Sequence, residues 1–126
     1  MKRDMDLVRQ ILFAMEKDET QIIFGESNPV KVDGYKRENI DYHMKIMAQA
    51  GLLHEDLFEI SSDPNLPKIY VSDYSISWLG HEFLDAARDN KRWEKVKDVM
   101  SQVGGFVFDV GKQLLIQYLK SELKLP

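Results

Sequence analysis

Apolar residues recur three or four positions apart in five parts of the chain, which is the spacing of amphipathic helices. The pattern predicts helices over residues 4–17, 36–50, 78–89, 91–102 and 108–123. Gly51 follows the second helix and Gly104 and Gly105 follow the fourth, where glycine commonly ends a helix. Ser77 stands before the third helix and is expected to cap its N-terminus.

Between the second and third helices the pattern changes to two short β-prone runs, Leu57–Ile60 and Lys68–Val71. The residues between these runs, 61–67, contain two prolines and predict a stiffened connecting loop. A helix, a β-hairpin and a returning helix are typical of a winged helix. We therefore expect an α+β fold, a winged helix-turn-helix with a small β-hairpin wing and additional C-terminal helices.

Residues 18–35 are less regular. Gln21–Phe24 and Val30–Val32 are β-prone, and Gly25–Pro29 between them has the composition of a turn. Either these runs form a small strand pair, or a short helix over Tyr35–Asn39 takes the place of the compact second helix of many winged helices.

The last predicted helix has an apolar band wider than one packing stripe. We expect a winged-helix domain over residues 1–90 and a helical extension over 91–126. The extension either completes the core of the same domain or forms the interface of a two-fold dimer. The residues assigned to that dimer interface are Phe108, Leu115, Ile116, Leu119 and Leu123.

Composition narrows the classes of protein. The 126 residues include no cysteine, so neither a disulfide framework nor a thiolate site can form. No apolar run approaches the ~20 residues that span a bilayer, and the charged N-terminus does not resemble a signal peptide. A cytoplasmic protein without a membrane partner is expected. Residues 1–90 contain 10 Lys or Arg and 17 Asp or Glu, a net charge of −7, whereas residues 91–126 carry a net charge of +3.

Three phrases of the sequence carry a family likeness. They are Met1–Leu7 (MKRDMDL), Tyr42-His43 together with Ala50–Leu53 (AGLL), and Ser77–Ala86 (SWLGHEFLDA). They resemble a family of bacteria and their prophages, domain of unknown function 2513, which is similar to YjcQ-type winged helices. The likeness covers nearly the whole chain and implies the fold and a prophage context. It implies no activity. The family usually has Leu-Thr before the tryptophan, and Ile76-Ser77 here keeps a capping hydroxyl.

The second helix offers side chains of the kinds that read DNA. Asn, Gln, Arg and Lys match the edges of bases, and cations neutralise phosphates. The candidate DNA-binding residues are Lys36, Arg37, Asn39, Tyr42, Lys45, Gln49 and, in the wing, Lys68. Glu38 and Asp41 stand among them and reduce the net charge of residues 36–49 to +1.

Metal binding and catalysis have little support. His43, His54 and His81 are far apart and lack the paired spacing of zinc sites, so no metal or other cofactor is expected. We expect His43 and His81 to pack at the edge of the core. No phosphate-binding glycine loop, nucleophile elbow or paired-histidine motif occurs, and the chain is not expected to be an enzyme.

Two functions follow as hypotheses. One is a small regulatory module that inserts helix 36–50 into double-stranded DNA and rests its wing on the backbone. The other is a protein–protein interaction module in which Tyr42, Ile46 and the Leu57–Val71 hairpin contact a partner. The acidic charge of residues 1–90 favours the protein partner, and the cations of helix 36–50 favour DNA. Acidic side chains interrupting the basic face would count against DNA.

Overall fold

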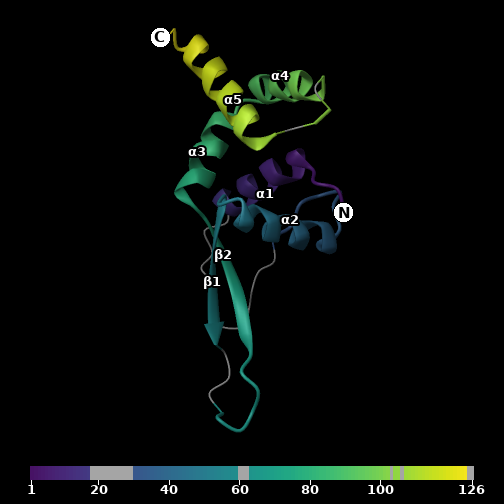
Figure 1. Ribbon diagram of the computed structural model, residues 1–126, viewed down its shortest axis with the longest axis vertical. Helices are drawn as coiled ribbons and strands as arrows, with labels where there is room; N and C mark the ends of the chain where they lie inside the picture. Colours follow the sequence, from purple (N-terminus) through teal and green to yellow (C-terminus); the bar gives the residue numbers. More distant parts are fainter. Residues whose placement is uncertain (18–29, 60–62, 103, 106, 125–126) are drawn as a thin grey trace. The chain divides into compact units, whose positions relative to one another are not determined.

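The computed structural model describes residues 1–17, 30–59, 63–102, 104–105 and 107–124. Contacts between Cα atoms divide the chain into two compact units, Met1–Gly80 and His81–Pro126. The first unit contains α1 (Met5–Lys17), α2 (Arg37–Gln49), β1 (Leu53–Glu59), β2 (Tyr70–Ile76) and the start of α3 (Trp78–Ala87). The second contains the rest of α3, α4 (Asn90–Ser101) and α5 (Phe108–Glu122) (Figure 1).

The core of the first unit lies where α1 and α2 pack against each other. Each helix turns one apolar stripe inward, because residues three and four apart share a helix face. The buried residues of these stripes are Leu7, Val8, Ile11 and Leu12 of α1, and Ile40, Met44 and Met47 of α2. Burying each such side chain contributes roughly 1.5–3 kcal/mol before the entropy cost of ordering it.

A buried histidine ties the start of α1 to α2. His43 is only 2% exposed, and its Nε2 accepts a hydrogen bond from the backbone N–H of Asp4 at 2.9 Å. Its Nδ1 lies 2.7 Å from the carbonyl oxygen of Asn39 and donates to it, because Nε2 is the acceptor. Asp4 in turn accepts from the backbone N–H of Leu7 at 3.2 Å and from the hydroxyl of Tyr35 at 2.9 Å.

The strands β1 and β2 form an antiparallel hairpin in which Leu53 lies opposite Ile76 and Glu59 lies opposite Tyr70. Figure 1 shows the hairpin extending beyond α1 and α2. Alternate residues of a strand point to opposite faces. One face, called the inner face below, carries Leu53, Glu55, Leu57, Glu59, Tyr70, Ser72, Tyr74 and Ile76. The outer face carries His54, Asp56, Asp73 and Ser75.

A tight corner joins α2, β1 and α3. The backbone N–H of Ser77 donates to the carbonyl of Leu52 at 3.1 Å, and the Ser77 hydroxyl donates to the carbonyl of Gly51. That hydroxyl also accepts from the backbone N–H of Gly80 at 3.0 Å, which confirms Ser77 as the cap of α3. Gly80 is buried, and a Cβ added there would lie 2.1 Å from the carbonyl oxygen of Leu52.

The second unit buries aromatic and aliphatic side chains. Phe83 contacts Trp93 edge to face at a ring separation of 6.1 Å, and Phe108 at 5.1 Å. The remaining buried apolar residues of this unit are Leu84, Ala86, Ala87, Val96, Met100 and Leu115. Arg92 is buried as well, and its guanidinium donates to the carbonyl of Ala86 and to Glu122, each at 2.8 Å.

The predicted α+β class is confirmed, and the order of elements is consistent with a winged-helix-like arrangement. The predicted helices agree with the observed ones to within two residues at each end. The hairpin strands are displaced from their predicted positions, because pairing with the opposite strand extends β1 back to Leu53 and β2 forward to Ile76. Polar residues in both segments conceal this extension in the sequence.

The segment before α2 also differs from expectation. Val30–Val32 is not a strand, and Tyr35 and Lys36 precede α2 rather than forming a separate helix. Arg37 to Asn39 are instead the first turn of α2. The predicted strand Gln21–Phe24 and the turn Gly25–Pro29 lie outside the described residues.

Candidate functional site

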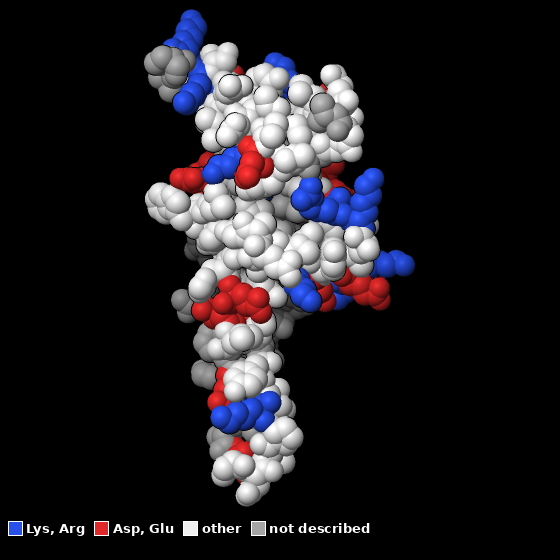
Figure 2. All heavy atoms as spheres, in the orientation of Figure 1, with Lys and Arg blue, Asp and Glu red and all other residues white. Residues whose placement is uncertain are grey.

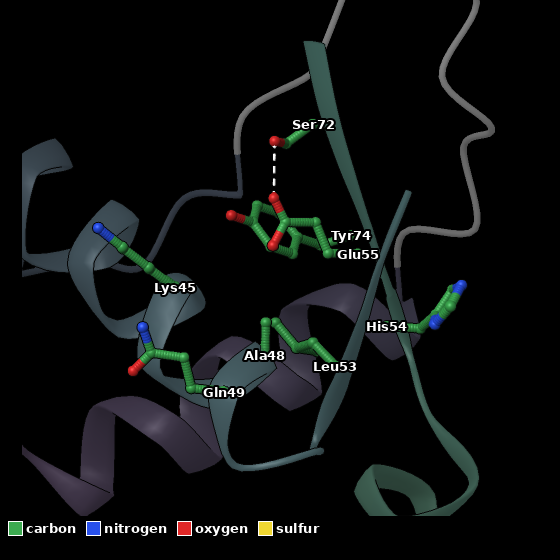
Figure 3. Close-up of a pocket in the computed structure, with 8 residues that line it drawn as sticks. All are labelled: Lys45, Ala48, Gln49, Leu53, His54, Glu55, Ser72 and Tyr74. Atoms are coloured by element: carbon green, nitrogen blue, oxygen red, sulfur yellow. Dashed lines mark hydrogen bonds between the residues drawn. The ribbon is translucent and has the colours of Figure 1, made fainter. Parts of the chain in front are cut away.

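The candidate site is a hollow of about 550 Å³ between the C-terminal half of α2 and the hairpin. It is lined by Lys45, Ala48, Gln49, Leu53, His54, Glu55, Ser72 and Tyr74. In Figure 3, Glu55 and Tyr74 lie on the side of the hairpin towards α2, whereas His54 lies on the other side of its strand. The hollow is therefore formed mainly by α2 and the inner face.

The hairpin side of this hollow is electronegative. Glu55 accepts a hydrogen bond from the Ser72 hydroxyl at 2.8 Å. The pKa of Tyr74 is raised above its ordinary value, first by partial burial and then by the negative charges of Glu55 and Asp41. An added negative charge, such as a phosphate, is disfavoured beside these groups because like charges repel.

Beyond the hollow the hairpin exposes large apolar side chains. Leu57 is 65% exposed and Tyr70 is 55% exposed, and both lie on the inner face. The residues joining the strands add Leu66, 59% exposed, and Ile69, 55% exposed. Clustered exposed apolar groups of this size mark interaction surfaces more often than isolated ones do.

The structure separates the proposed DNA-binding residues into two sets. Arg37 forms an ion pair with Asp41 at 2.7 Å, and its guanidinium also donates to the carbonyl of Val30. The backbone carbonyl of Asn39 accepts a hydrogen bond from His43. The exposed ring of Tyr42 contacts the His43 ring edge to face. The side chains of Arg37 and Tyr42 therefore have contacts within the first unit, whereas the contact of Asn39 is made by its backbone.

The remaining candidates are exposed. Lys45 and Gln49 lie together at the hollow, Lys36 precedes α2, and Lys68 lies between the strands. Figure 2 shows basic and acidic side chains next to one another on the face it draws, without an extended basic area. The assignment of these residues to DNA stays a prediction.

The proposed dimer residues differ in exposure. Leu115 is fully buried within the chain, and Phe108 is partly buried against Phe83. Ile116 and Leu119 are partly exposed, and Leu123 is 60% exposed. All of them except Leu115 therefore have some surface to offer a second copy, and the dimer itself stays a prediction.

The histidines do not gather in the structure. His43 is buried as expected, but His81 is exposed rather than packed at the edge of the core, since the apolar stripe of α3 runs through Phe83 and Leu84 instead. His54 forms an exposed ion pair with Asp56 at 3.0 Å. Across the described part of the chain, no three His, Asp or Glu residues are arranged to hold a metal ion.

Sequence reasoning missed Glu55, Ser72 and Tyr74 as site residues. The run Leu53–Glu59 (LHEDLFE) lacks the strict apolar/polar alternation of a half-buried strand, so its sequence pattern did not mark them. The partners that complete the site, on β2, depend on the register of the hairpin.

Comparison with known proteins places the chain in a family. Residues 2–106 match the model of the family described as "Hypothetical protein (DUF2513)". A protein of Haemophilus influenzae described as "Uncharacterized protein" is 32% identical over 97 residues, which cover 77% of this chain and 76% of that protein. No solved structure matches. Within the described ranges, no helix has the length and apolar character needed to cross a membrane. By the extent of the family match and the identity to this relative, the chain belongs to the DUF2513 family.

Proposed function

We propose that this protein is a protein–protein interaction module whose contact surface is the β-hairpin. The observation that carries the proposal is the exposure of Leu57, Leu66, Ile69 and Tyr70 on one projecting element. Leaving apolar side chains in water is unfavourable, and a partner that covers them would recover this free energy. Tyrosine is also common among residues that dominate binding energy.

The charge of the hairpin favours a protein partner over DNA. Residues 53–76 contain five acidic residues and one lysine, a net charge of −4 with histidine neutral. A wing that rests on a DNA backbone needs cations to neutralise phosphates. On α2, Arg37 is paired with Asp41, which weakens the basic face that DNA binding would require.

The test is photo-crosslinking in cells that make the protein. A benzophenone amino acid is placed at Ile69, beside the exposed residues, and at Gln113 of α5 as a control, since both positions are exposed. We expect a discrete crosslinked protein from position 69 that is absent from position 113. Replacing Leu57 and Tyr70 by serine should remove this adduct.

Equal adducts from both positions, or an adduct that persists after the two serine substitutions, would contradict the proposal. Circular dichroism of the double variant provides the control for folding. Because Leu57 and Tyr70 are largely exposed, their replacement should change the stability of the chain only slightly.

A further inference from the structure

We propose that the inner face of the hairpin, from the hollow beside α2 to Tyr70, binds a segment of another protein in which Lys or Arg residues stand next to apolar ones. This inference rests on the proposed function and adds the chemistry of the partner. It also assigns the binding to one of the two faces of the hairpin.

The apolar part of the surface is continuous along the strands. Leu57 lies opposite Ser72, and Tyr70 lies opposite Glu59. Leu57 and Tyr70 are therefore diagonal neighbours on the same face, with Cα atoms about 7–8 Å apart, within reach of one apolar side chain of a partner. Tyr74 extends the surface towards α2.

The charged part lies beside the apolar part. Glu55 and Glu59 are each two residues from Leu57 on the same strand, so about 13 Å of strand separates them and Leu57 lies midway. Asp41 of α2 adds negative charge near Tyr74, and its ion pair with Arg37 offsets part of that charge. Among the described residues that line the hollow, Lys45 is the one lysine or arginine.

This pattern selects the chemistry of the occupant. Burying Leu57 and Tyr70 requires apolar groups, and the neighbouring carboxylates would then need cations to offset their lost hydration. Lys and Arg meet this need, and Arg can bind a carboxylate through two parallel hydrogen bonds. A nucleic acid would bring phosphates to the same carboxylates and is disfavoured.

The outer face also carries an acidic residue, Asp56, which lies outside the proposed binding surface. Asp56 follows Glu55 in the chain and forms an ion pair with His54, and it lies on the opposite side of the strand. Changing Asp56 to lysine alters the net charge as much as changing Glu55 or Glu59 does, but leaves the inner face unchanged. Asp56→Lys is therefore the matched control.

The experiment selects binders from a random library of 12-residue peptides displayed on phage, with the full chain immobilised. We expect the enriched peptides to be rich in Lys or Arg and in apolar residues. In fluorescence anisotropy, synthetic copies should bind Glu55→Lys and Glu59→Lys at least about tenfold more weakly. The Asp56→Lys variant should bind them as the unchanged protein does.

Enrichment of neutral or acidic peptides, no enrichment, or equal losses in all three lysine variants would overturn the inference. So would sedimentation velocity showing that Leu57→Ser converts a dimer into a monomer, because the occupant would then be a second copy. Any of these results would contradict the inference about the partner's chemistry. If a crosslinked partner is still found at position 69, the proposed function is supported all the same. Absence of the crosslinked partner counts separately against the proposed function.

Discussion

At the scale of single residues, His43 is the clearest structural determinant of the first unit. We expect His43→Phe to lower the free energy of unfolding by roughly 1–3 kcal/mol, because it removes the partners of the Asp4 N–H and the Asn39 carbonyl. Urea denaturation measures this. The control is His54→Phe, whose histidine is exposed and whose replacement should change stability by less than about 0.5 kcal/mol. Equal effects of the two substitutions would show that the hydrogen bonds of His43 contribute little.

Asp89 caps α4 and gives the second unit a defined response to acid. The Arg92 backbone N–H donates to its carboxylate at 2.8 Å, and this hydrogen bond is the main reason that the pKa of Asp89 lies below its usual value. A lowered pKa means that the carboxylate stabilises the fold fully above about pH 4 and loses this effect as the pH falls through the folded-state pKa.

We therefore expect Asp89→Asn, which keeps a capping side chain, to match the unchanged protein near neutral pH. Between about pH 5 and 2 its melting temperature should fall less than that of the unchanged protein. Trp93 is buried and reports on the second unit, so its fluorescence can be followed in a Trp78→Phe background. Parallel melting curves over this whole pH range would rule out the assigned role of Asp89.

Some of these single-residue roles could be predicted from residue type alone. Ser77 was predictable as a cap because a hydroxyl stood just before an apolar helical pattern. The exposure of His81 was not predictable in the same way, since an isolated histidine beside an apolar stripe can point either way. The hydrogen bond from the Asp4 N–H to His43 could not be predicted, because these residues are 39 apart in sequence and meet only when α1 packs against α2.

At the scale of elements, α3 packs so closely against the turn before β1 that there is no space for a side chain at Gly80. We expect Gly80→Ala to destabilise the chain by about 1–3 kcal/mol or more, because the added Cβ would clash with the backbone carbonyl of Leu52. Gly34→Ala is the comparison, since among the described residues, apart from its chain neighbours, no atom lies within 4 Å of its Cβ position, and its φ of +86° is the unfavourable feature. Thermal denaturation should place Gly80→Ala well below Gly34→Ala, and the reverse order would contradict this packing.

The helices and the hairpin differ in how much the sequence could predict. A helix is stabilised by contacts between residues three and four apart, so its apolar period is visible locally. The paired segments Leu53–Asp56 and Ser72–Ile76 are rich in polar residues, and they become strands because each supplies backbone partners to the other. Their inner face, and therefore the candidate site, followed from that register.

At the scale of the whole molecule, the net charge favours the hypothesis of a protein partner over that of DNA. The chain has a net charge of −4, and residues 53–76 alone account for that value. We expect no measurable change in the anisotropy of labelled duplex DNA at low salt. Binding that weakens steeply with added salt, and that Lys36→Glu with Lys45→Glu abolishes, would restore the DNA hypothesis.

The sequence by itself determined the helices, the Ser77 cap of α3, the presence of a hairpin after α2 and the acidic balance of residues 1–90, because each depends on neighbouring residues or on composition. Tertiary structure alone decided that His43 is buried against Asp4 and that Glu55, Leu57, Tyr70 and Tyr74 share one face. These outcomes depend on strand register and on which elements pack together. Neither is encoded in any local window of the chain.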